Sequence, residues 1–152
     1  MSTWGDFSTE QPEVAGWSRR ILAKYGLAYL ATLRFDGSPR IHPVCPIIAG
    51  SQLYVGLIRN SPKRADLDRD GRFSLHCLPG PRNAEILLTG TAHRLTSNEV
   101  AALQKSAETN QLISDEPFWY RLDLGAVQWV TYDNKLEGRP LPTRASWQGV
   151  AS

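Results

Sequence analysis

The sequence predicts a mostly β, α+β fold in which an antiparallel sheet of about six strands closes into a barrel, with short helices at the connections. Short apolar runs of strand length recur along the chain, separated by turn-forming residues. Helical periodicity is confined to a few short segments, too few for a doubly wound parallel sheet. The 152 residues, of which 41% are hydrophobic, suit a single domain, residues 1–152, with a real core.

The first predicted element is a helix over residues 12–25. Pro12 suits a first helical position, and Gly26 is typical of a helix end. Between them, apolar side chains recur at helical spacing: Val14, Trp17, Ile21, Leu22 and Tyr25.

The barrel is predicted over residues 27–132. Its expected strands are residues 27–34, 40–49, 53–58, 72–78, 84–95, 118–124 and 126–132, the last two being either separate or one strand broken at Gly125. Asp36-Gly37 predicts a hairpin turn. Because Pro43 and Pro46 cannot donate to a ladder, their strand should be an edge or be bulged. Gly90 predicts a bulge or bend.

Two further helices and an irregular tail complete the prediction. Pro62 begins a short helix that runs through Leu67, and Thr96 precedes another. Residues 110–116 have loop-like composition. The tail, residues 133–152, carries Pro140 and Pro142 and is expected to be irregular.

Composition excludes several classes of protein. A formal charge of +2 is too small for a nucleic-acid binder. No signal peptide or membrane-spanning run is recognisable, so we expect a cytoplasmic protein. Cys45 and Cys77 are too few for a disulfide framework. His42, His76 and His93 lie on three different predicted strands without a local pair, so no metal site is expected.

A basic turn is the most informative segment. Ser61-Pro62-Lys63-Arg64 stands where a strand leads into a helix start. Free backbone N–H groups, the positive end of the helix dipole and two cations can bind a phosphate there. The alternative is a solvated basic turn paired with the acidic residues that follow, and the local pattern leaves both open.

The proline-interrupted strand is the second candidate. Prolines leave main-chain groups unpaired over residues 40–46, and such groups can meet the polar edge of a flat heterocycle. Cys45 has no identifiable base beside it, so we expect no nucleophilic role. Trp119, Trp129 and Trp147 either wall a substrate pocket or pack in a core or dimer interface.

Three segments occur in an order that resembles one family. LATLRFDGSPRIHPVCPI, then LYVGLIRNSPKRADLDRDGRFSLHCL, then ILLTGTAHRLT, resemble the pyridoxamine 5′-phosphate oxidase-like flavin-binding split-barrel family. The resemblance implies a six-stranded antiparallel split β-barrel that dimerises, with FMN in a groove at the subunit interface.

The resemblance also implies a set of cofactor-binding residues. Lys63 matches the phosphate-binding lysine, and Glu85 falls where a residue of the partner subunit approaches the flavin. Residues 42–46 match the stretch that touches the isoalloxazine through its main chain. With the basic turn, the candidate cofactor-binding residues are Ser61, Pro62, Lys63, Arg64, His42, Pro43, Val44, Cys45, Pro46, Gly56, Leu57 and Glu85.

A flavin-dependent oxidoreductase acting on a small molecule is therefore expected, as a homodimer and with no catalytic side chain, since the flavin itself carries hydride or electrons. The alternatives are a coenzyme F-420-dependent reductase, a non-enzymatic flavin- or haem-binding protein, and a cofactor-free barrel. His42 replaces an arginine of the true oxidase and the tail has no match, which argues against vitamin B6 oxidation.

Overall fold

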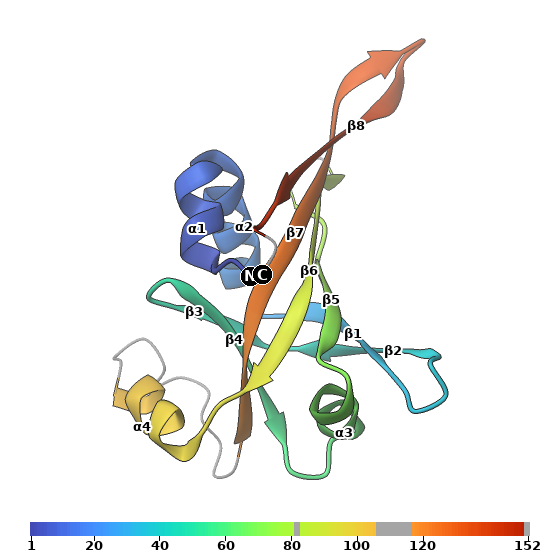
Figure 1. Cartoon of the computed structure of the whole chain (residues 1–152). Coiled ribbons are helices and arrows are strands. Elements are labelled where there is room, and N and C mark those ends of the chain that lie inside the picture. Colours follow the sequence, from blue (N-terminus) through green and yellow to red (C-terminus); the bar gives the residue numbers. More distant parts are fainter. Residues whose placement is uncertain (81–82, 106–116, 151–152) are drawn as a thin grey trace.

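The computed structural model describes residues 1–80, 83–105 and 117–150. Its strands are β1 (Ala28–Leu33), β2 (Pro39–Val44), β3 (Pro46–Ala49), β4 (Gln52–Ile58), β5 (Arg72–Cys77), β6 (Glu85–Arg94), β7 (Pro117–Leu136) and β8 (Arg139–Gln148). Its helices are α1 (Trp4–Glu10), α2 (Pro12–Tyr25), α3 (Pro62–Arg69) and α4 (Ser97–Lys105). Figure 1 shows the strands crossing in one sheet with the helices at its margins.

The sheet is antiparallel and curls until its two edges meet. Its strand order is β2-β1-β5-β6-β7-β4-β3, and β8 pairs with β7 outside this path. The end strands β2 and β3 are separated in the chain by Cys45 alone. Because one residue cannot span an open sheet, the sheet must close on itself as a split barrel.

The prolines explain where the barrel is split. Pro43 and Pro46 lie in β2 and β3, each of which has a ladder partner on one side only. The prediction of an edge is confirmed, and the predicted strand over residues 40–49 is two strands rather than one. A proline cannot continue a ladder on both sides, so this segment ends the sheet.

The barrel interior is apolar, and the N-terminal helix packs its aromatic side chains into the same core. The fully buried side chains of the barrel include Leu30, Leu53, Val55, Leu75, Ile86, Leu88, Leu122 and Leu124. Trp4 and Phe7 of α1 are also fully buried, and the Phe7 ring lies 5.4 Å from that of Trp147. Helix α1 was not predicted; Thr3 and Asp6 form a capping box that starts it.

The other helices follow the predicted signals. Helix α2 spans the predicted residues and ends at Gly26 with φ of 65°. Helix α3 begins at Pro62 as predicted. Thr96 and Glu99 form the hydrogen bonds of a capping box before α4, where Leu103 is buried. Within the described residues no helix is long and apolar enough to span a membrane.

The predicted strands 118–124 and 126–132 are parts of one strand. β7 runs without a break along β6, and the register shifts between Thr89 and Gly90, leaving Gly125 as the extra residue. This confirms the irregularity predicted at Gly90.

An irregular tail is predicted for residues 133–152, and this prediction is wrong for residues 133–148. β7 continues to Leu136, turns at Glu137-Gly138 and returns as β8, forming a two-stranded ribbon that extends beyond the barrel (Figure 1). Pro140 and Pro142 are tolerated because β8 has a ladder partner on one side only.

Candidate functional site

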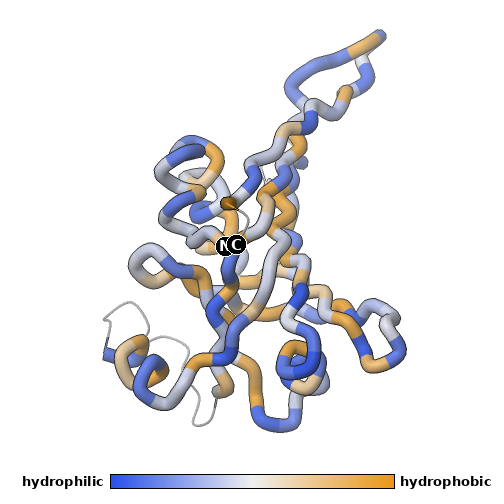
Figure 2. Tube along the Cα trace, viewed as in Figure 1, coloured by the Kyte–Doolittle hydropathy of each residue, from blue (hydrophilic) through white to orange (hydrophobic). Residues whose placement is uncertain are grey.

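A pocket lies where the barrel is split. It has a volume of about 400 Å³ and is enclosed by the β2–β3 junction, the end of β4, the start of α3 and one residue of β7. Its lining consists of Pro43, Val44, Cys45, Gly56, Leu57, Ile58, Asn60, Ser61, Pro62, Lys63 and Trp119. Figure 2 shows the apolar end of β4 followed by a hydrophilic turn that leads into α3.

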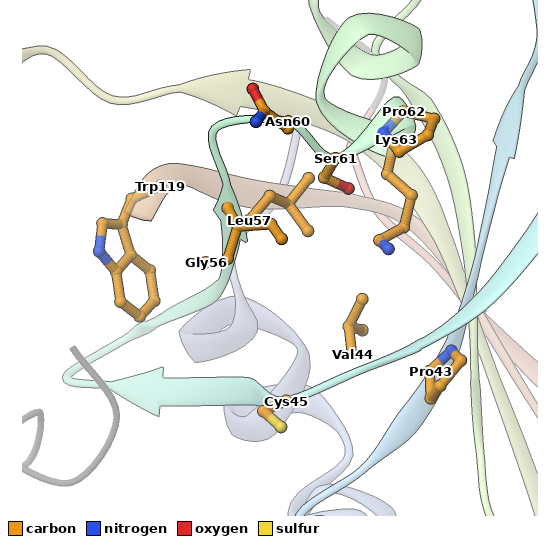
Figure 3. A pocket seen from close by; sticks show the side chains of 11 residues that line it. Pro43, Val44, Cys45, Gly56, Leu57, Asn60, Ser61, Pro62, Lys63 and Trp119 are labelled. Atoms are coloured by element: carbon orange, nitrogen blue, oxygen red, sulfur yellow. The ribbon is translucent and has the colours of Figure 1, made fainter. Parts of the chain in front are cut away.

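Lys63 supplies the positive charge of this pocket. It stands in the first turn of α3, and Figure 3 shows its ammonium group directed into the space above Val44. Burial, and then the nearby charge of Arg40, hold the pKa of Lys63 below its ordinary value. A desolvated ammonium gains strongly from an anionic partner, so the pocket favours a ligand that brings a negative charge.

Ser61 supplies a hydroxyl that the described part of the protein leaves unused. It is the N-cap residue of α3 but makes no side-chain capping bond. Its side chain is buried, with 7% of the residue exposed, and its Oγ has no hydrogen-bond partner among the described residues. A buried hydroxyl without a partner costs about 1–3 kcal/mol, so the Ser61 hydroxyl fits a ligand oxygen.

A second cation, Arg40, lies close to Lys63. The Nε of Arg40 donates to Asp66 Oδ2 at 2.7 Å, and the Thr32 hydroxyl donates to the same oxygen at 2.8 Å. Burial opposes ionisation of Asp66, but these two hydrogen bonds hold its pKa below the ordinary value. The carboxylate thereby fixes Arg40 close enough to Lys63 to perturb its pKa.

Arg64 does not line the pocket, although it adjoins Lys63 in sequence. Its Nε donates to the carbonyl of Arg59 at 2.8 Å, its Nη1 lies 3.3 Å from Asp68, and its guanidinium sits 4.8 Å from the ring of Phe118. Successive helical residues point about 100° apart. Only one of the two predicted cations therefore faces the pocket.

The far wall of the pocket is apolar. Gly56 and Trp119 face each other across the β4–β7 ladder, and a Cβ at Gly56 would lie 3.1 Å from the indole. The Trp119 Nε1 points away from Lys63 in Figure 3 and is buried without a partner among the described residues. One end of the pocket is therefore cationic and the other aromatic.

Besides Arg64, three predicted residues lie outside this pocket. His42 is exposed on β2, paired with Leu30, and Pro46 begins β3. Glu85 lies on β6 and accepts a hydrogen bond of 3.2 Å from the hydroxyl of Tyr132. Their roles toward a cofactor stay predictions.

The pocket also contains residues that the candidate list lacked: Ile58, Asn60 and Trp119. The sequence allows Trp119 to be a pocket wall or part of a packed core, and in the structure it is both. Trp147 is in the core, where its Nε1 donates to Glu10 at 2.8 Å. Trp129 is half-buried against the same core. The loop-like stretch 110–116 lies outside the described residues.

No family model and no curated protein matches this sequence. Solved structures do match. A heme binding protein from Mycobacterium smegmatis superposes with a TM-score of 0.65 at 22% identity, covering 86% of this chain and 56% of that one. The chain therefore spans little more than half of that protein's length.

Two further matches extend over nearly the whole of both chains. A pyridoxamine 5′-phosphate oxidase-related, FMN binding protein from Nostoc punctiforme has a TM-score of 0.63 at 11% identity, covering 93% of this chain and 96% of that one. PhzG from Burkholderia lata, solved with tetrahydrophenazine-1-carboxylic acid, has a TM-score of 0.60 at 15% identity with the same coverages. The fold is the split barrel of pyridoxamine 5′-phosphate oxidase-like proteins.

Proposed function

We propose that this protein binds FMN in the pocket between the β2–β3 junction and α3, and that it is a flavin-dependent oxidoreductase acting on a small molecule. The observation that carries the proposal is the pairing of Lys63 with the Ser61 hydroxyl, which has no partner among the described residues, both directed into one pocket at a helix start. A phosphate monoester suits such a pair because it brings negative charge and several acceptor oxygens.

The rest of the pocket fits a flavin ring. Val44, Leu57 and Trp119 offer apolar contacts to a flat heterocycle. Cys45 lies between two strands and outside both, so its main-chain groups are free of the β2 and β3 ladders. When bound, FMN would supply hydride and electron transfer, while the chain's own residues would bind, orient and desolvate it.

A homodimer is part of the proposal. On the outer face of β1 and β2, Tyr29 is 47% exposed and Ile41 is 63% exposed. Tyr29 pairs with Pro43, which also lines the pocket, so this apolar face runs into the pocket rim. A second copy covering the face would close the pocket. Light scattering should then give a dimer, and Ile41→Glu should shift it toward monomer.

Haem binding is the second candidate. Cys45 lines the pocket, and a cysteine thiolate is one of the ligands that hold haem iron. The Mycobacterium smegmatis neighbour, moreover, is a heme binding protein. The visible spectrum separates the candidates, because a flavin absorbs in the blue, coenzyme F-420 shifts those bands and haem gives an intense Soret band.

The Ser61→Ala variant tests the phosphate assignment with little risk to the fold. Because the hydroxyl has no partner in the described structure, its removal should leave the free energy of unfolding unchanged or raise it. The affinity for FMN should fall about tenfold or more, the value of one charge-assisted hydrogen bond. Flavin fluorescence quenching measures the affinity, and urea unfolding measures the stability.

Arg64→Met and Lys24→Met serve as matched controls. Arg64 is held by Asp68 and Arg59 away from the pocket, and Lys24 lies at the end of α2 beside the Tyr25 ring. Both variants should retain wild-type affinity for FMN. If Ser61→Ala binds FMN as tightly as the wild type, or if the controls lose as much affinity, the phosphate does not bind at this turn.

A further inference from the structure

A second pocket lies on the other side of Trp119. It has a volume of about 430 Å³ and is enclosed by the β3–β4 turn, the outer face of β4 and β7, and helix α4. Tyr54 and Arg121 face each other across the β4–β7 ladder, two positions before the Gly56–Trp119 pair on the same face. The second pocket therefore continues the surface that forms the first.

Trp119 separates the two pockets. It lines the first one and packs in a small cluster with Ala49 and Leu103, both of which line the second. Tyr54, another lining residue of the second pocket, packs against the same cluster. Only the indole of Trp119 would thus separate a ligand in the second pocket from a ligand in the first.

The second pocket contains a polar atom without a partner among the described residues. The Gln52 Oε1 is buried and accepts no hydrogen bond there, and Tyr54, which is half-buried, lines the same pocket. Burial raises the pKa of Tyr54, so its phenol stays protonated and can donate. Arg121 binds Asp123 through Nε at 2.7 Å and Nη2 at 3.2 Å, leaving its Nη1 outside that ion pair.

The charges of this pocket favour a neutral ligand. The Arg121 guanidinium is already paired with Asp123, and the carboxylate of Glu99 also lines the pocket. A carboxylate ligand would meet two carboxylates for one guanidinium. A cationic ligand would meet Arg121, while Asp123 is already bound to Arg121 and Glu99 to the N–H and hydroxyl of Thr96. Burying an uncompensated charge is costly, whereas a neutral polar group needs only hydrogen bonds.

We propose that the second pocket binds a small, planar, neutral molecule with a primary carboxamide edge. Its N–H groups would donate to Gln52 Oε1, and its carbonyl would accept from the Tyr54 hydroxyl and Arg121 Nη1. Such a molecule would lie beside the first pocket and is therefore a candidate reactant for the cofactor. Only that role rests on the proposed function; binding itself does not.

Benzamide is the probe, titrated into the full-length protein by isothermal titration calorimetry. Benzamide should bind saturably and at least about fivefold more tightly than N,N-dimethylbenzamide, which lacks the N–H donors, and benzoate, which is charged. Equal binding of the three compounds, or no saturable binding of benzamide, would overturn the proposal.

Two variants locate the binding. Gln52→Leu and Tyr54→Phe should each weaken benzamide about fivefold to tenfold by removing one hydrogen bond. Exposed Gln128 provides the matched control, because Gln128→Leu should leave benzamide binding unchanged. If it weakens benzamide as much as Gln52→Leu does, or if both pocket variants bind normally, the carboxamide does not bind here.

A third variant separates this proposal from the proposed function. Lys63→Met should bind benzamide as the wild type does and bind FMN about tenfold more weakly, whereas Tyr54→Phe should retain FMN affinity. Failure of FMN binding with intact benzamide binding would reject the flavin proposal alone, and the reverse result would reject only the second pocket.

Discussion

The indole of Trp119 occupies the space that a side chain at Gly56 would need. A Cβ atom at Gly56 would lie 3.1 Å from Cζ2 of Trp119, its partner across the β4–β7 ladder. The absence of a side chain at residue 56 thus lets the indole lie against the strand. There it forms a wall of the proposed flavin pocket and packs beside the second pocket.

Gly56→Ala should displace this indole. The added methyl group would lie closer to the indole than an ordinary van der Waals contact allows. The variant should therefore lose about 1–2 kcal/mol of unfolding free energy and bind FMN more weakly. Urea unfolding and flavin fluorescence measure the two effects. Gly16→Ala is the control: its Cβ would meet nothing closer than 3.6 Å in helix α2, where alanine is the better helix former. A Gly56→Ala protein as stable as Gly16→Ala would contradict the packing described here.

The bulge between β6 and β7 provides a second test. A Cβ at Gly90 would lie 1.9 Å from the carbonyl oxygen of Asp123, whereas a Cβ at Gly125 would meet nothing closer than 3.6 Å. Gly90→Ala should therefore cost about 3 kcal/mol or more, because backbone has to move, and Gly125→Ala should cost much less. Thermal unfolding of both variants measures the difference, and similar melting temperatures would show that the register is wrong.

Asp66 should stabilise the fold only when it is ionised. Its hydrogen bonds from Arg40 and Thr32 lower its pKa below the ordinary value of 3.8. The stabilisation is therefore fully present above about pH 5 and is lost as the pH falls below 3.8 through the folded-state pKa. Asp66→Asn should cost about 2–3 kcal/mol at pH 7, because it leaves Arg40 without its partner.

The matched control for this effect is Asp70→Asn. Asp70 binds Arg72 on the exposed surface, so its loss should matter far less at pH 7. In urea titrations, the stability difference between wild type and Asp66→Asn should shrink from pH 6 to pH 3. A difference independent of pH would contradict an ionised Asp66.

The affinity for FMN should fall at alkaline pH. Burial and Arg40 lower the pKa of Lys63 below its ordinary value of 10.5, so its charge is lost at a lower pH than that of an exposed lysine. Phosphate binding favours the charged ammonium, and affinity should decline as the pH rises toward and past the lowered pKa. Fluorescence titrations between pH 7 and pH 10 measure the decline, and the Lys63→Met protein should show none of it.

Much of the barrel could be predicted because local signals agree with tertiary structure. The Asp36-Gly37 turn, Pro62 at a helix start and Gly26 at a helix end each have one favoured local conformation. Helix α1 was missed although the signal was present, since Thr3 and Asp6 form a capping box before Trp4. The prediction of an irregular tail is wrong because Pro140 and Pro142 do not exclude an outer strand, which leaves one side unpaired.

The pocket was only partly predictable. Ser61 and Lys63 follow from the helix-start pattern, but helical geometry already argues that adjacent Arg64 points elsewhere. Trp119 could not be placed from sequence, since its position beside Gly56 depends on the β4–β7 register. The Arg40–Asp66 contact joins residues from β2 and α3 and likewise needs the closed barrel.

Comparing FMN with riboflavin in the wild-type protein and in Lys63→Met tests the central claim most directly, because the two ligands differ only in the phosphate. The wild type should bind FMN at least about tenfold more tightly than riboflavin, the value of a charge-assisted phosphate contact. Lys63→Met should lose most of that preference and keep its riboflavin affinity. Equal affinities of the wild type for both flavins, or an unchanged preference in Lys63→Met, would contradict a phosphate site at Lys63.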